Sequence, residues 1–163
     1  MKLDHYDLDK LLLTAMKSEI ESKDIYMKLA EKTKNGLLKN KLRFLADEEE
    51  KHRMFIEDIY RNHYPKEKIE IPGKSIVPLP GVDLTEETPL SKLLKQAMEA
   101  EKAASEFYKS LAQRFEDQTK MHNTLMYFAD MEIGHFKILE NEKESMERYE
   151  ESDVYWPMTH VGP

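Results

Sequence analysis

Apolar residues recur at steps of three and four along two long blocks of the chain, 8–63 and 90–150. This spacing places them on one face of a helix, so the pattern predicts amphipathic helices rather than strands. Five of the 7 Pro residues lie between the blocks, and the weaker segments 33–36 and 115–120 are typical of short turns. We therefore expect an all-α fold with four helices, at about 8–33, 37–62, 89–115 and 119–150.

The connection between the two blocks, 64–88, is too long for a tight helix–helix turn. About 25 extended residues can run the length of a helix that measures roughly 37 Å. We expect the third helix to begin at the far end of the bundle, with Thr88 as its cap and Pro89 at its first position. The expected fold is one domain, 1–163. It consists of a first helix hairpin (8–63), a long crossover (64–88), a second helix hairpin (89–150) and a C-terminal tail (151–163).

The two blocks also resemble each other in sequence. Residues 15–30 and 97–112 are identical at 6 of 16 positions, and residues 45–52 and 128–135 at 4 of 8. Duplication of a packing unit explains the matching Leu and Ala residues. It does not explain matching Glu and His residues within the apolar faces, where packing alone would favour Leu. We expect two hairpins related by a pseudo-twofold axis.

Six polar residues interrupt the apolar faces at mid-height of the four expected helices: Glu19, Glu49, His52, Glu101, Glu132 and His135. Burying an unpaired carboxylate costs several kcal/mol, and no Lys or Arg lies at the same level to neutralise these Glu residues. The carboxylates could be protonated, the bundle could be open to water, or cations could lie between them. Two divalent cations would balance four carboxylates with both His neutral, which favours a metal site.

The spacing supports this interpretation. Glu49 and His52, like Glu132 and His135, are one turn apart on their helices and can reach one metal ion or a close pair. Two such pairs, together with a Glu from each of two further helices, form the di-metal carboxylate pattern of helical bundles. Imidazole and carboxylate ligands suit iron and manganese and admit zinc. The alternative is a satisfied polar layer that only fixes how the helices align.

These residues resemble the rubrerythrin branch of the ferritin-like di-iron superfamily, most specifically in LADEEEKH (45–52) and in the spacing of Glu19 and Tyr26. The resemblance covers roughly 8–150 and implies a ferritin-like four-helix bundle with two iron ions. It implies that Glu49 and Glu132 bridge the metals. It further implies that the terminal ligands are Glu19, His52, Glu101 and His135. Proteins of this kind are homodimers that reduce hydrogen peroxide or dioxygen at a diferrous centre, so the resemblance implies the same here.

The sequence departs from that family in two ways. It contains 0 Cys, whereas full-length rubrerythrins append a rubredoxin domain whose iron is held by cysteines. The expected electron source is therefore external, such as a separate rubredoxin. Ala104 stands where the family usually carries an additional Glu that exchanges with a His. Ala104 favours the alternative of an iron-binding or ferroxidase-type protein without peroxidase turnover; a structural role with zinc or an empty site is a third hypothesis.

Two further pairs match in the repeat. Tyr26 and Tyr108 follow the in-face Glu of their helices by two turns. Each hydroxyl could bond a ligand carboxylate as a second layer of the site, or be satisfied elsewhere in an aromatic core. Asp47 and Asp130 lie beside the expected ligand turns, where they either bond a ligating His or face solvent.

Composition and charge also indicate which partners and which cellular location to expect. The net charge of −7 disfavours nucleic acid as a partner, because phosphate binding needs a basic face. The longest aliphatic run is Leu11–Leu13, too short to span a membrane. The first ten residues are too acidic and polar for a signal peptide, so we expect a cytoplasmic protein.

Overall fold

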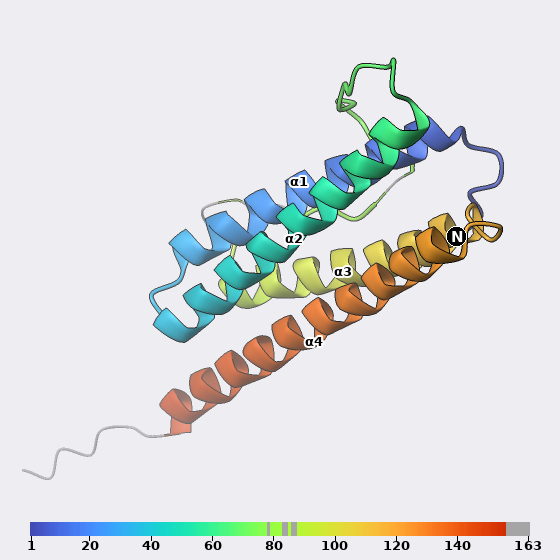
Figure 1. Ribbon diagram of the computed structural model, residues 1–163. Helices are drawn as coiled ribbons and strands as arrows, with labels where there is room; N and C mark the ends of the chain where they lie inside the picture. Colours follow the sequence, from blue (N-terminus) through green and yellow to red (C-terminus); the bar gives the residue numbers. More distant parts are fainter. Residues whose placement is uncertain (78, 83–84, 86–87, 156–163) are drawn as a thin grey trace, which may run out of the picture.

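The computed structural model describes residues 1–77, 79–82, 85 and 88–155 and contains four long helices (Figure 1). No strand occurs among these residues. The sequence-based expectation of an all-α, ferritin-like four-helix bundle is confirmed. The helices are α1 (Leu8–Lys32), α2 (Gly36–His63), α3 (Leu90–Gln113) and α4 (Thr119–Tyr155).

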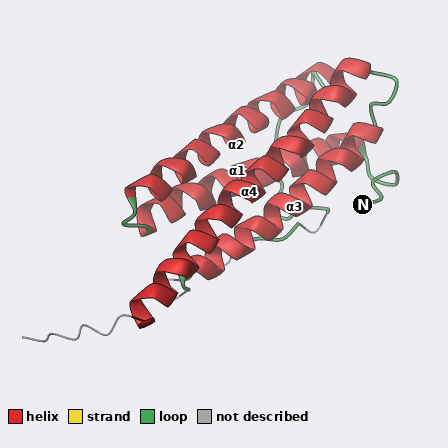
Figure 2. Cartoon of the chain, turned by 90° about the horizontal axis from the view of Figure 1, so that it is seen from below, coloured by secondary structure: helices red, strands yellow, loops and turns green. Residues whose placement is uncertain are grey.

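The bundle consists of two antiparallel hairpins. Helix α1 packs along α2, and α3 packs along α4, while the hairpins meet through α1 with α3 and α2 with α4. In Figure 1, α2 and α3 run in the same direction, so the crossover between them returns along the length of the bundle. Figure 2, seen from below, shows all four helices along one common axis. The expected long crossover is therefore present.

Local sequence explains most of the helix ends. The side chain of Asn35 accepts hydrogen bonds from the backbone N–H groups of Leu37 and Leu38, which caps the start of α2. The predicted start of α3 was one residue early, because Pro89 itself occupies the cap position and Thr88 lies outside the helix. Helix α4 also continues to Tyr155, past the predicted end at 150. The last part of the expected tail, 156–163, lies outside the described residues.

Two apolar clusters fill the bundle on either side of a polar middle layer. One contains residues near the start of α1 and α4 and the end of α2 and α3, such as Leu12, Ile56 and Phe107. The other contains residues from the opposite helix ends, such as Leu29 and Leu42. Crossover residues complete both clusters: Val77 is buried in the first, and Val82 packs against the second. The crossover thus covers one side of the core.

No helix among the described residues is long and apolar enough to cross a membrane.

Candidate metal centre

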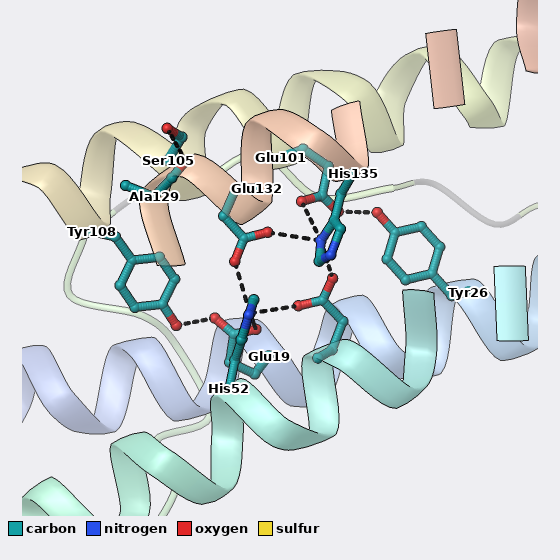
Figure 3. Close-up of polar contacts among 10 residues, drawn as sticks. Glu19, Tyr26, His52, Glu101, Ser105, Tyr108, Ala129, Glu132 and His135 are labelled. Carbon is teal, nitrogen blue, oxygen red and sulfur yellow. Dashed lines mark hydrogen bonds and ion pairs between the residues drawn. The ribbon is translucent and has the colours of Figure 1, made fainter. Parts of the chain in front are cut away.

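The six polar residues singled out in the sequence meet in the middle layer of the bundle (Figure 3). Each helix contributes at least one of them, and none is more than 3% exposed. They reach the interior because each lies on the same face as the apolar residues of its helix. The cluster comprises Glu19, Glu49, His52, Glu101, Glu132 and His135.

The six residues divide into two overlapping groups, and within each group the possible ligand atoms lie within 4.8 Å of one another. One group contains Glu19 and His52, and the other contains Glu101 and His135. Glu49 and Glu132 belong to both groups. The arrangement therefore offers two neighbouring positions that share two carboxylates.

Glu49 and Glu132 each present one oxygen to each histidine. The Nδ1 atom of His52 lies 3.0 Å from Oε1 of Glu132 and 3.6 Å from Oε2 of Glu49. The Nδ1 atom of His135 lies 3.1 Å from Oε2 of Glu132 and 3.1 Å from Oε1 of Glu49. By contrast, Glu19 approaches only His52, at 3.7 Å, and Glu101 approaches only His135, at 3.6 Å. The shared carboxylates thus have the geometry of bridges.

Several of these buried atoms have no hydrogen-bond partner. They are Oε1 of Glu49, Oε1 of Glu132 and both ring nitrogens of His52. The Nδ1 atom of His52 lies at ion-pair distance from Glu132, but the angles do not make a hydrogen bond. Unsatisfied buried donors and acceptors cost about 1–3 kcal/mol each, so native proteins rarely leave several together. Two cations in the two positions would bind both carboxylate oxygens and one ring nitrogen of His52.

Burial disfavours every charge in the cluster, and the contacts among its members decide which groups ionise. Burial and neighbouring carboxylates raise the pKa of Glu19 and of Glu101 well above the usual carboxyl value. Burial acts in the same direction on Glu132, but its contacts with the two His side chains prevail and lower its pKa. Burial would lower the pKa of His52, yet its carboxylate partners raise it to about 12.

The pKa values of Glu49 and His135 shift in the same directions as those of their repeat equivalents, Glu132 and His52. The histidine contacts outweigh burial at Glu49 and lower its pKa, and the carboxylate contacts outweigh burial at His135 and raise its pKa. These shifts favour protonated Glu19 and Glu101 and charged His52 and His135, and they favour the carboxylate form of Glu49 and Glu132. Two divalent cations would balance four carboxylates with both His neutral, and their binding would release protons. The residues therefore fit a pair of divalent cations.

Two buried tyrosines connect the hairpins at this layer. The hydroxyl of Tyr26 on α1 donates to Glu101 on α3, and the hydroxyl of Tyr108 on α3 donates to Glu19 on α1 (Figure 3). Each tyrosine therefore bonds the carboxylate of the other hairpin rather than the Glu of its own helix. This exchange holds both non-shared carboxylates in place.

Sequence reasoning missed two neighbours of the site. The ring of Phe128 stacks on His52 with centroids 4.3 Å apart, and the Ser105 hydroxyl donates to the backbone carbonyl of Ala129. The departure from the repeat is a signal for Phe128, since the equivalent residue in the first hairpin is Leu45. Asp47 and Asp130 are exposed, which agrees with the alternative that they face solvent.

A bundle of two helix hairpins with a long crossover and a buried layer of four Glu and two His defines a ferritin-like carboxylate protein. The family model for rubrerythrin matches residues 10–143. The chain belongs to the rubrerythrin family.

Comparison with solved structures gives the same fold. A hypothetical protein from Pyrococcus furiosus is 34% identical, with a TM-score of 0.81, and the alignment covers 91% of this chain and 95% of that one. No curated protein matches the chain.

Proposed function

We propose that the protein is a non-haem di-iron oxidoreductase that reduces hydrogen peroxide or dioxygen with electrons from an external donor. The observation that carries this proposal is the pair of overlapping ligand groups that share Glu49 and Glu132. In this assignment Glu49 and Glu132 would each serve both iron positions. Glu19 with His52 and Glu101 with His135 complete the two positions, and manganese or zinc would fit the same ligand types.

When bound, two ferrous ions would supply the two electrons that convert hydrogen peroxide and two protons into two water molecules. The chain's own contribution is the environment. Four carboxylates favour the higher positive charge of oxidised iron, and the buried position of the six residues limits access of solvent. Tyr26 and Tyr108 orient the non-shared carboxylates and place hydroxyl protons at the edge of the site.

The electron source in this proposal is a separate protein such as rubredoxin. The 163 residues contain 0 Cys and therefore no cysteine-ligated iron of their own. We further propose a homodimer in the cytoplasm, where reduced donor proteins would be available. The resemblance to rubrerythrins supports the homodimer by analogy.

The direct test mixes anaerobically reduced, iron-loaded protein with one equivalent of hydrogen peroxide in a stopped-flow instrument. We expect rapid oxidation of the iron, followed by repeated turnover when reduced rubredoxin is added. Zinc-loaded protein is the control, because zinc fills the site but has no redox chemistry. Absence of rapid oxidation at one equivalent would contradict the peroxidase proposal.

A second candidate is iron handling without turnover. Ala104, a half-buried residue one turn beyond Glu101, favours it, because the family usually has an additional Glu at this position. A handling protein would oxidise its iron once and then stop, even with excess reduced donor. Counting the peroxide consumed per chain therefore separates the two candidates.

A further inference from the structure

A chain of aromatic rings leads from the metal centre to the surface. The ring of Phe128 on α4 stacks on His52, with centroids 4.3 Å apart and planes at 30°. The ring of Phe55 on α2 meets Phe128 edge-on, with centroids 5.0 Å apart. Phe55 is half-buried and lines a surface groove. Three rings in contact thus link a candidate ligand to solvent.

Among the described residues, the repeat carries these two rings on one side of the centre and not on the other. The equivalents of Phe128 and Phe55 in the other hairpin are Leu45 and Ile138. The two positions that carry rings on the His52 side of the repeat therefore carry aliphatic residues on the His135 side. Packing alone does not require this difference, because Leu and Ile fill the equivalent space in the pseudo-symmetric half.

The groove at the outer end of the rings has a volume of about 570 Å³. It lies between the end of α2 and the start of α4, which meet at the same end of the bundle (Figure 1). In a chain with a net charge of −7, the groove is nearly neutral, with one acidic and one basic side chain. Its lining includes Phe55, Asp58, Ile59, Lys120, Met121 and Thr124.

We propose that this groove, formed by α2 and α4 around Phe55, is where the electron-donor protein docks, and that electrons reach the centre through Phe55, Phe128 and His52. The inference rests on the proposed function. The partner is a small protein with a one-electron centre and a largely apolar contact face. Electron-transfer partners typically bury less than about 1,200 Å², which a short groove with an aromatic edge can support.

The electron balance is simple. Each reduced donor loses one electron, and no atom or proton is transferred between the proteins. Two donors in succession return two ferric ions to the ferrous state, which matches the two electrons consumed by each hydrogen peroxide molecule. The same groove is used twice, since the His135 side has no equivalent ring path.

The first experiment measures docking without turnover. Isotope-labelled, zinc-loaded protein is titrated with oxidised rubredoxin, whose paramagnetic iron broadens nearby amide signals. We expect broadening centred on Phe55, Asn62 and Thr124. Asn62→Trp should weaken binding by about tenfold by filling the groove. Asn141→Trp, the same change at an exposed position near the other end of the bundle, should not.

The second experiment measures electron transfer. Phe128→Leu, which installs the residue of the other repeat, should slow reduction of the ferric protein severalfold at saturating rubredoxin while its dissociation constant stays the same. Phe44→Leu is the control, because Phe44 is 51% exposed on the same α2 helix as Phe55. Broadening centred elsewhere on the bundle, or no broadening by a rubredoxin that still reduces the protein, would overturn the proposal. Failure of the peroxide reaction with pre-reduced protein would instead overturn the proposed function.

Discussion

The hydroxyl of Tyr26 donates a hydrogen bond to Glu101 across the interface between the two hairpins. Its repeat equivalent, Tyr108, does the same with Glu19 in the opposite direction. The two hydrogen bonds connect α1 and α3, whose mutual contacts are far fewer than those within each hairpin. The tyrosines therefore link hairpin association to the position of the carboxylates.

Tyr26→Phe should weaken both hairpin association and metal binding. The change leaves an oxygen of Glu101 without its donor, so we expect the free energy of unfolding to fall by about 1–2 kcal/mol. Loss of an outer hydrogen bond to a ligand should also reduce metal affinity by about tenfold. Denaturant unfolding and competition with a chelator measure the two effects. Tyr127→Phe, at a side chain that is 61% exposed, is the control and should change neither.

Metal binding should release protons. In the metal-free protein, Glu19 and Glu101 have raised pKa values, and the pKa of His52 is raised to about 12. His135 is raised as well. These raised pKa values favour the protonated form of all four groups, so loading two divalent ions should release more than one proton per chain. Calorimetry in buffers with different ionisation enthalpies counts them. Release of one proton or none would contradict this electrostatic description.

The metal-free protein should lose stability as the pH rises. Because the folded-state pKa of His52 lies above its usual 6.5, the stabilisation it provides is complete below that value and is lost toward the folded pKa of about 12. Glu19 and Glu101 act in the same direction from lower pH. Urea unfolding with a chelator present should therefore give midpoints that decrease from about pH 6.5 to about pH 9. Midpoints that increase over this range would contradict the prediction.

The cap of α2 provides a test of the fold that is independent of the metal. Asn35→Ala removes the side-chain acceptor for two backbone N–H groups and should reduce the free energy of unfolding by about 1 kcal/mol. Asn40→Ala is the matched control, since Asn40 is exposed within the same helix and Ala has the higher helix propensity. Equal effects of the two substitutions in denaturant unfolding would show that the cap contributes nothing.

Much of this architecture follows from local sequence. The three–four spacing of apolar residues predicts the four helices, and the matched Glu and His residues within that spacing predict which side chains meet. The contacts between residues of different hairpins could not be predicted, because they depend on the relative position in which the two hairpins pack. For the same reason, the sequence could not show that Tyr26 bonds Glu101 rather than Glu19, or that Phe128 stacks on His52. Helix α4 passes its predicted end at 150 because no Gly or Pro follows that position before Pro157.

Because Glu49 and Glu132 belong to both candidate metal positions, both positions should lose their metal together when these two residues are changed. Metal content per chain, measured by elemental analysis after anaerobic iron loading, tests this directly. We predict two iron ions per chain for the unchanged protein and none tightly bound after Glu49→Ala with Glu132→Ala. Glu48→Ala with Asp130→Ala, two acidic residues beside the site, is the matched control and should retain both ions. Two ions retained by the Glu49→Ala, Glu132→Ala protein would contradict the account.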